Sequence, residues 1–216
     1  MSAELVLYTY FRSSAAFRVR IALNLKGLHA EHRFVHLLKD GGQQFAAKYG
    51  ELNPQHLVPT LVHNGRALQQ SLAIIEYLDE VFPAPPLLPG DALGRARVRA
   101  LACAIACDIH PLNNLRVRKY LKMGRSDAEI RDWQAHWIAL GFAALEAMLA
   151  NSEHTGRFCH GDAPTLADIC LIPQMANAHA LEMDLSAYPT LTRIEDAALA
   201  LPAFSNALPK TQPDAE

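Results

Sequence analysis

The sequence Tyr10-Phe11-Arg12-Ser13-Ser14 joins an apolar segment at residues 4–10 to an amphipathic segment at residues 14–26. The first is predicted to be a strand buried on both faces, and the second a helix with apolar residues at a spacing near 3.6. A helix that begins here presents free backbone N–H groups and the positive end of its dipole, which favour an anion. No cysteine stands at this junction, so the anion is expected to come from a ligand.

Around this junction the chain predicts alternating strands and helices. Strands are expected at residues 4–10, 31–37, 58–62 and 67–68, and helices at 14–26, 43–49 and 71–78. Gly27 suits the left-handed position that ends a helix. Asn64-Gly65 predicts a two-residue hairpin, and Ser71 suits an N-cap. The order βαβαββα indicates one small α/β domain.

A proline-rich connector at residues 82–90 is unfit for a helix or a central strand and marks a domain boundary. The chain beyond it predicts helices only, to about residue 201. The predicted organisation is a first domain at 1–82, a linker at 83–92 and an all-helical domain at 93–216.

Within the helical part, His110-Pro111 is expected to interrupt a long helix because proline removes a hydrogen-bond donor. Ser126 and Thr165 begin segments with the spacing of a capping box. Residues 211–216 are expected to form a loose tail.

The composition excludes several classes of protein. Hydrophobic residues make up 50% of the 216, charged residues 19%, and the formal net charge is −2. This balance suits a compact globular protein and draws it neither to nucleic acid nor to an anionic membrane. Because no apolar run is long enough to span a bilayer and the N-terminus lacks a signal-peptide pattern, a cytoplasmic location is expected.

The four cysteines form no Cys-x-x-Cys pair, so neither a zinc nor a redox motif is expected. Cys103 and Cys107 lie one helical turn apart and could share a metal, but their Ala and Ile neighbours favour small buried core residues. His32 and His36 are expected to be partly exposed strand residues, because four-residue spacing in a strand builds no metal clamp. No metal is therefore expected.

Strings spread over nearly the whole chain, in order, resemble the zeta-class glutathione transferases. They are Tyr10-Phe11-Arg12-Ser13-Ser14 with Phe17-Arg18-Val19-Arg20, Lys39-Asp40-Gly41-Gly42-Gln43-Gln44-Phe45, Leu52-Asn53-Pro54 with Val58-Pro59-Thr60-Leu61, Gln70-Ser71-Leu72-Ala73-Ile74-Ile75-Glu76-Tyr77, Thr165-Leu166-Ala167-Asp168, Pro173-Gln174 and Tyr188-Pro189-Thr190. The resemblance implies an α/β plus all-α protein, with a thioredoxin-like N-terminal domain (βαβαββα) followed by an all-helical domain, and a homodimer.

The resemblance also implies roles for individual residues. Ser13 and its neighbour Ser14 are implied to hold the glutathione sulfur, and Val58, before a cis-proline at Pro59, to bind the cysteinyl main chain as an added strand would. The remaining implied positions are Gln70 and Ser71 at the γ-glutamyl carboxylate, Gln44 near the glycyl end, His110 and Asn114 in the helical domain, Arg12 at the substrate and, more weakly, Arg116 and Arg118.

Residue chemistry alone leaves structural roles open for the same positions. Ser13 or Ser14 can be only a helix cap, Pro59 only a proline at the start of a strand, and Ser71 only an N-cap. Arg18 is expected, like Arg20, to be a structural or surface charge.

The activity implied by the resemblance is glutathione-dependent cis–trans isomerisation of a maleyl-keto acid, maleylacetoacetate or maleylpyruvate, in the breakdown of tyrosine or other aromatic compounds. The thiolate adds to the double bond, which can then rotate, and leaves again, so glutathione acts as a coenzyme. Both carboxylates of the substrate need cationic partners, preferably arginine. The implied partners are glutathione and a small dicarboxylate.

Two positions depart from the zeta pattern. Ala15 stands where the family usually has a cysteine, and Ala180 where it often has an arginine for the substrate carboxylate, with His179 beside it. These departures leave two alternatives open: a transferase that conjugates or dehalogenates small α-haloacids, and a non-catalytic binding module of the same fold.

Overall fold

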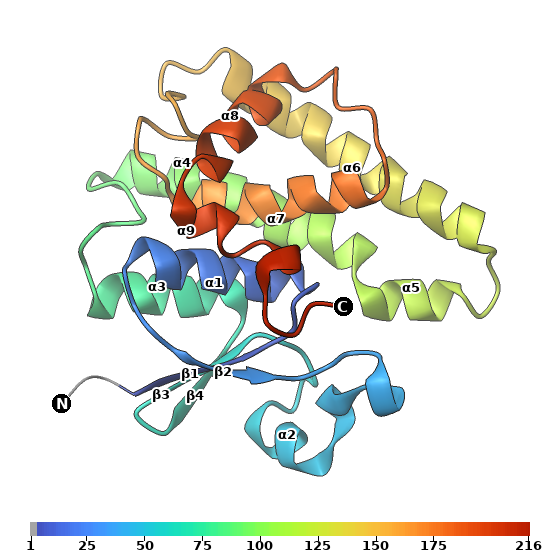
Figure 1. Ribbon diagram of the computed structural model, residues 1–216. Helices are drawn as coiled ribbons and strands as arrows, with labels where there is room; N and C mark the ends of the chain where they lie inside the picture. Colours follow the sequence, from blue (N-terminus) through green and yellow to red (C-terminus); the bar gives the residue numbers. More distant parts are fainter. Residues whose placement is uncertain (1–3) are drawn as a thin grey trace. The chain divides into compact units, whose positions relative to one another are not determined.

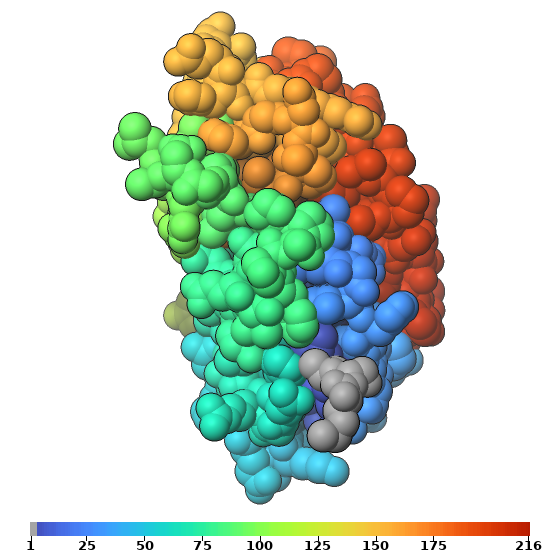
Figure 2. Space-filling model, turned by 90° about the vertical axis from the view of Figure 1, so that its left-hand side faces the viewer, coloured from blue at the N-terminus to red at the C-terminus, as the bar shows by residue number. Residues whose placement is uncertain are grey.

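The computed structural model describes residues 4–216 and divides into two compact units. The first unit runs to Pro86 and includes Leu201–Glu216, and the second is Leu87–Ala200. The division falls in the proline-rich connector, where residues 83–86 are exposed and belong to the green surface of Figure 2. The C-terminal end differs from the predicted organisation, because residues 201–216 group with the first unit and not with the helical one.

The first unit contains a four-stranded sheet in the order β2-β1-β3-β4 (Figure 1). Strand β1 (Leu5–Thr9) runs parallel to β2 (Glu31–Phe34) and antiparallel to β3 (Thr60–His63), and β3 pairs antiparallel with β4 (Arg66–Gln69). The predicted hairpin at Asn64-Gly65 is confirmed, and both residues have the positive φ that such a turn requires.

Helices α1 and α3 lie side by side on one face of this sheet, and α2 lies on the other side (Figure 1). Their bounds are α1 Ser14–Leu25, α2 Ala47–Leu52 and α3 Ser71–Val81. The helices bury side chains that the 3.6-residue spacing predicts, namely Phe17, Ile21, Ile75 and Leu78, and they also bury Ile74, whereas the predicted Leu72 is half-buried. Each buried side chain contributes about 1.5–3 kcal/mol of hydrophobic stabilisation. The predicted βαβαββα order is confirmed.

Three loops of the first unit emerge at one edge of the sheet. The register pairs Tyr8 with Thr60, and Thr60 with Gln69. Because antiparallel neighbours bring the end of one strand to the start of the next, β1 ends where β3 begins and β4 ends. The segments that follow Thr9, precede Thr60 and follow Gln69 are therefore neighbours.

The second unit is entirely helical. Its helices are α4 Ala92–Cys103, α5 Leu115–Leu121, α6 Asp127–Ala150, α7 Leu166–Ala180 and α8 Pro189–Leu199. Helix α7 packs against α4 and α8, and its residues from Leu166 to Met175 are all buried. A π-helical turn and a 3₁₀ turn separate α4 from α5, which confirms the predicted interruption near His110-Pro111. No helix in residues 4–216 is both long and apolar enough to cross a membrane.

Several local predictions are wrong. The C-terminal tail is not loose: helix α9 (Pro202–Ser205) packs on α1, and Asp214 accepts a hydrogen bond from the main chain of Phe11. Cys103 and Cys107 are exposed and not buried in the core. Cys103 is the last residue of α4, and Cys107 lies in the π-helical turn that continues it. Strand β2 ends at Phe34, so His36 lies outside it. The helix expected at 43–49 is a 3₁₀ turn at 43–45 followed by α2.

Candidate ligand site at the sheet edge

The N-terminus of α1 carries the first part of the site. Ser13 is its N-cap: the hydroxyl oxygen accepts from the amide of Ala16 at 3.2 Å, and the Ser13 amide donates to the carbonyl of Tyr10 at 3.0 Å. A hydroxyl oxygen that already accepts one hydrogen bond still has its proton to donate. The first turn of α1 contains no acidic residue, so the helix dipole remains available to an anion beside Ser13.

The neighbours of Ser13 differ in exposure. Ser14 is buried as the first residue of α1, Ala15 is half-buried, and Arg12 is exposed. Burial raises the pKa of Tyr10, and the positive charge of Arg12 opposes this shift. Arg12 is thus an exposed cation immediately before Ser13 in the chain, close enough to Tyr10 for its charge to act on that residue.

The loop before β3 carries the second part. The Val58–Pro59 peptide bond is cis, as predicted, and Val58 is buried to 7% exposure. Within residues 4–216, neither the amide nor the carbonyl of Val58 makes a hydrogen bond. Because no group in this described part of the protein occupies the N–H and C=O of Val58, this segment is ready to pair with an extended peptide.

Two side chains hold this loop in place. Asn53 donates to the carbonyl of Leu57 at 2.8 Å and to the hydroxyl of Thr60 at 3.0 Å. The Tyr49 hydroxyl donates to the same carbonyl at 2.5 Å, and burial raises the pKa of Tyr49. The open main chain of Val58 is therefore positioned from both sides of the loop.

The N-terminus of α3 carries the third part, and here one prediction needs correction. Ser71 is the first helical residue and not the N-cap; Gln70 holds that place with a φ of 69°, and no side chain caps the helix. The Ser71 hydroxyl is buried and accepts from Arg18 at 3.3 Å. The end of α3 therefore favours a carboxylate. Its N–H groups have no side-chain cap, its first turn has no acidic residue, and the buried guanidinium of Arg18 lies behind Ser71.

Gln44 is also in the first unit. Its side chain is buried, and its Oε1 has no hydrogen-bond partner among residues 4–216. Gly42 has a φ of 112°, and a Cβ at that position would come within 2.6 Å of the Gln44 amide. The glycine thus leaves room for Gln44 to fold inward, and its buried oxygen is an acceptor that this conformation leaves unused.

Ser13, Val58 and Ser71 belong to the three segments that meet at the edge of the sheet. Together they offer a hydroxyl donor with a helix N-terminus, an open main chain, and an uncapped helix N-terminus with an arginine. These features suit a short extended peptide that has an anionic group in its middle and a free carboxylate at one end.

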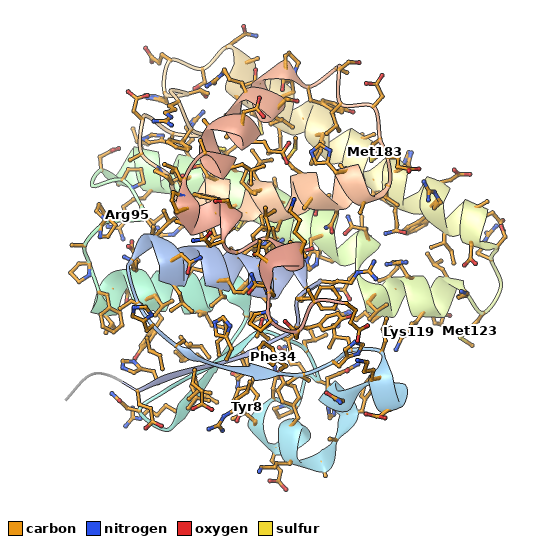
Figure 3. All side chains as sticks on the ribbon, viewed as in Figure 1. Tyr8, Phe34, Arg95, Lys119, Met123 and Met183 are labelled. Carbon is orange, nitrogen blue, oxygen red and sulfur yellow. The ribbon has the colours of Figure 1, made fainter. Side chains whose placement is uncertain are left out.

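The remaining predicted residues lie in the second unit, between α4 and α5. Asn114 is the N-cap of α5, where its side chain accepts from the amide of Arg116 at 3.1 Å, so its structural role is certain. His110 opens the 3₁₀ turn, and Arg116 and Arg118 are exposed. Helix α5 is a basic surface element, from whose end Lys119 and Met123 project in Figure 3.

The second departure from the expected pattern, Ala180, lies at the end of α7, whereas the first, Ala15, lies in α1. Ala180 is exposed and has no charge to offer. His179 lies beside it, and its Nε2 contacts the carboxylate of Glu195 at 2.9 Å. His179 is thus engaged within its own unit, through Glu195 of α8.

Several residues that build the site were not singled out from the sequence. Tyr49 and Asn53 position the Val58 loop, and Arg18 lies behind Ser71 with 2% exposure. An arginine within the apolar run of α1 is a usable signal, because a charge is buried there only if it has partners. No comparable signal marks Asn53, whose partner Leu57 offers only its main chain.

Comparison with protein families gives a match over this part of the chain. The model that describes the glutathione S-transferase N-terminal domain matches residues 12–81. A probable maleylacetoacetate isomerase of Vibrio cholerae is 51% identical over 214 residues, which cover 98% of this chain and 99% of that protein.

Solved structures agree over the full length. The holo structure of a bacterial zeta-class maleylpyruvate isomerase has a TM-score of 0.94 at 47% identity, and covers 97% of this chain and 99% of its own. A maleylacetoacetate isomerase from Anaeromyxobacter dehalogenans, with dicarboxyethyl glutathione and citrate in its active site, has a TM-score of 0.87 at 44% identity, and covers 100% and 99%.

Proposed function

The chain belongs to the zeta class of the glutathione S-transferase family, and we propose that it is a glutathione-dependent cis–trans isomerase of maleylacetoacetate or maleylpyruvate. The observation that carries the proposal is the meeting of Ser13, Val58 and the N-terminus of α3 at one edge of the sheet. The three match the sulfur, the main chain and the γ-glutamyl carboxylate of glutathione.

The residues of the first unit have distinct tasks in this proposal. Val58 pairs its main chain with the cysteinyl residue, and α3, with Ser71 and Arg18, binds the γ-glutamyl carboxylate. Gln70 contacts the same end, and Gln44 accepts from the glycyl end. Ser13 donates its hydroxyl proton towards the sulfur while its oxygen stays engaged with Ala16, and Ser14 supports it.

Bound glutathione would supply a thiolate that adds to the cis double bond of the substrate, allows rotation, and leaves to give the trans isomer. A free thiol with a pKa near 8.5 is only a few per cent ionised at neutral pH. Lowering that pKa by about two units requires roughly 2.7 kcal/mol of preference for the thiolate. The Ser13 hydroxyl and the α1 dipole act on that charge.

The substrate carboxylates require cations. Arg12 is the residue that we assign to one of them, because it is exposed beside Ser13. The bound molecule in the A. dehalogenans relative is, by its name, glutathione with an added dicarboxyethyl group. This group has two carboxylates besides those of glutathione, which supports a dicarboxylate substrate here. We also assign His110 and Asn114 to the glutathione side of the site and Arg116 to the substrate.

The test supplies each maleyl-keto acid with glutathione at a small fraction of the substrate concentration. Complete conversion of either acid to its trans isomer, with glutathione recovered unchanged, is expected. No isomerisation of either acid would overturn the proposal. An Arg12→Gln variant is expected to raise the KM for the acid far more than that for glutathione, since only the substrate loses a partner.

A haloacid transferase is the second candidate, and the exposed Ala180 with its engaged neighbour His179 favours it. Without the arginine that the family often has at the position of Ala180, the site has one cation fewer for substrate carboxylates. Such a site suits a monocarboxylate better than a dicarboxylate. The two functions differ in stoichiometry, because a conjugating or dehalogenating reaction consumes glutathione and isomerisation does not. Measuring glutathione loss with a small α-haloacid separates them.

We further propose that the protein is a cytoplasmic homodimer. The outer side of the α4 segment carries exposed small or apolar residues at helical spacing, and these are Leu93, Ala96, Ala100, Cys103 and Cys107. Leu93 is 84% exposed in the single chain, and it belongs to this row of exposed residues, which is the kind of patch that marks a protein–protein interface. Sedimentation analysis is expected to give a dimer for the wild type and a shift to monomer for Ala100→Glu.

A further inference from the structure

The C-terminal segment of the first unit reaches the turn that carries the sulfur site. Tyr10 to Ser13 form this turn, which the Ser13 amide closes on the Tyr10 carbonyl. The amide of Phe11 donates to Oδ2 of Asp214 at 2.9 Å. That amide belongs to the residue two positions before Ser13, and its partner lies two hundred residues further along the chain.

Arg20 binds the other side of the same turn. Its guanidinium donates to the carbonyls of Tyr10 at 3.3 Å and Phe11 at 3.1 Å, and also to the carbonyl of Ala207. Burial lowers the pKa of Arg20 to about 10, and the carboxylate of Asp214 opposes this shift, so Arg20 remains charged at neutral pH. Arg20 therefore connects the turn to the C-terminal segment through Ala207, and Asp214 makes a second connection through the Phe11 amide.

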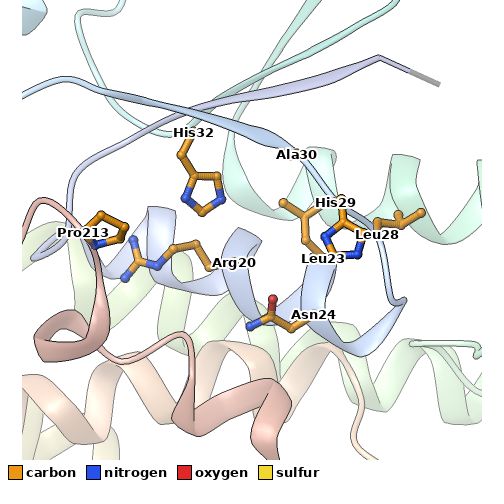
Figure 4. Close-up of a pocket in the computed structure, with 8 residues that line it drawn as sticks. All are labelled: Arg20, Leu23, Asn24, Leu28, His29, Ala30, His32 and Pro213. Carbon is orange, nitrogen blue, oxygen red and sulfur yellow. The ribbon is translucent and has the colours of Figure 1, made fainter. Parts of the chain in front are cut away.

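The C-terminal segment is held mainly by polar contacts over its last residues. Phe204 and Ala207 are buried and anchor its beginning. Further on, Pro213 lines a crevice of about 370 Å³ between α1 and β2, into which Arg20 extends from α1 with His32 on the strand opposite (Figure 4). The last residues thus border an open crevice, and the hydrogen bond from the Phe11 amide to Asp214 connects them to the turn.

We propose that Asp214 is a positioning residue for the sulfur site, which holds the turn from Tyr10 to Ser13 through the Phe11 amide. This inference rests on the proposed function, since it concerns the same serine. The Phe11 amide and carbonyl are both bound, by Asp214 and Arg20, immediately before Arg12 and Ser13. The direction of the Ser13 hydroxyl and the start of α1 follow from the turn that these two contacts fix.

The experiment compares Asp214→Ala with Asp214→Asn in the full chain. The alanine variant is expected to raise the apparent pKa of the bound glutathione thiol, read by thiolate absorbance. Its kcat/KM should fall about three- to tenfold, the range that loss of one hydrogen bond produces. The KM for glutathione should change little, because Val58 and α3 are untouched. The asparagine variant should restore most of the loss, since its amide oxygen still accepts from Phe11.

Amide hydrogen exchange of Phe11 gives a second measurement that needs no ligand, and exchange should be faster in Asp214→Ala. The matched control is Asp184→Ala, because Asp184 also accepts from a main-chain amide, that of Ser186, at 2.9 Å, but in the second unit. It should leave both measurements unchanged.

An Asp214→Ala protein with a wild-type thiol pKa overturns the proposal, whether or not Phe11 exchange rises. If the wild type itself does not ionise bound glutathione, the proposed function fails and this inference fails with it. That result is read from the wild type alone, so the two failures are distinguishable.

Discussion

Four helices of this protein fall into two pairs according to the residue at the third helical position. Two have an acidic residue there and begin with their own capping box, and two have alanine there and carry the proposed ligand site. Helices α6 and α7 have complete capping boxes, Ser126 with Glu129 and Thr165 with Asp168. Helices α1 and α3 have alanine at the same position, Ala16 after Ser13 and Ala73 after Gln70. An acidic side chain at this position accepts hydrogen bonds at the helix N-terminus and neutralises the positive end of the helix dipole. With alanine there, an anionic ligand can do so instead.

Local sequence therefore distinguishes two uses of one structural feature. In α6 and α7 the chain supplies its own carboxylate, and the helix end is closed. In α1 and α3 it supplies none, and in our proposal the sulfur and the γ-glutamyl carboxylate of glutathione occupy these ends. Changing the acid or the alanine tests this distinction in both directions.

The largest expected effect follows from removing the buried acid of α7. Asp168 is fully buried and accepts from the amides of Cys159 and Thr165, both at 2.8 Å, and from the Thr165 hydroxyl at 2.9 Å. Asp168→Ala leaves these donors without a partner, and the free energy of unfolding should fall by about 3–5 kcal/mol. Urea denaturation measures this loss.

The control for that experiment is Asp196→Ala, at an exposed position of α8. Its stability should stay within about 0.5 kcal/mol of wild type. If Asp168→Ala lowered the free energy of unfolding no more than Asp196→Ala, the capping box of α7 would not stabilise the protein. The structural role assigned to the acidic residue at the third helical position would then be wrong.

The second effect concerns the open end of α1. Ser13→Ala removes the hydroxyl donor, and the pKa of the bound thiol should return towards 8.5. If the hydroxyl alone accounts for a lowering of that pKa by about two units, the thiolate fraction at pH 7 falls about 25-fold, and kcat falls with it; a share supplied by the α1 dipole makes the loss smaller. Thiolate absorbance and initial rates at saturating glutathione measure both.

Ser13 also caps α1, and Ser13→Asp separates its two roles. Aspartate keeps the cap and places a negative charge beside the sulfur. Its melting temperature should match wild type, whereas its thiolate absorbance should be as low as that of the alanine variant or lower. A Ser13→Asp protein with normal thiolate would show that Ser13 serves only the helix.

The strands and helices of the first unit and the capping boxes of the second could be predicted from the sequence because each depends on neighbouring residues. Asn64-Gly65 determines its own turn, and Ser126 and Glu129 lie within one helical turn of each other. The parts that could not be predicted depend on contacts between distant residues. The Phe11 amide meets Asp214, and the N-cap position of α3 falls on Gln70 and not on Ser71 because of a backbone conformation that residue type does not reveal.

The third effect concerns α3, where an acid can be introduced. Ala73 is exposed at the position that Glu129 and Asp168 occupy in their helices. Ala73→Glu should close the helix end and repel the γ-glutamyl carboxylate, which raises the KM for glutathione about tenfold with little change in kcat. Ala73→Gln has a similar shape without the charge and should leave KM within about twofold of wild type. Equal values for the two variants would remove the electrostatic basis of the α3 assignment.

The smallest effect concerns the exposed capping box of α6. Its main-chain contact with Ser126, together with Arg125, lowers the pKa of Glu129 from 4.5 to about 2. Because the folded pKa is depressed, the stabilisation is present above pH 4.5 and is lost as the pH falls towards 2. Glu129→Gln should therefore be less stable than wild type at pH 6, and the gap between their melting temperatures should narrow steadily below pH 4.5. Added salt should narrow it at pH 6 as well, since the carboxylate is exposed and its attraction to Arg125 is screened. A gap that stays constant with pH would mean that packing, and not the charge of Glu129, stabilises the end of α6.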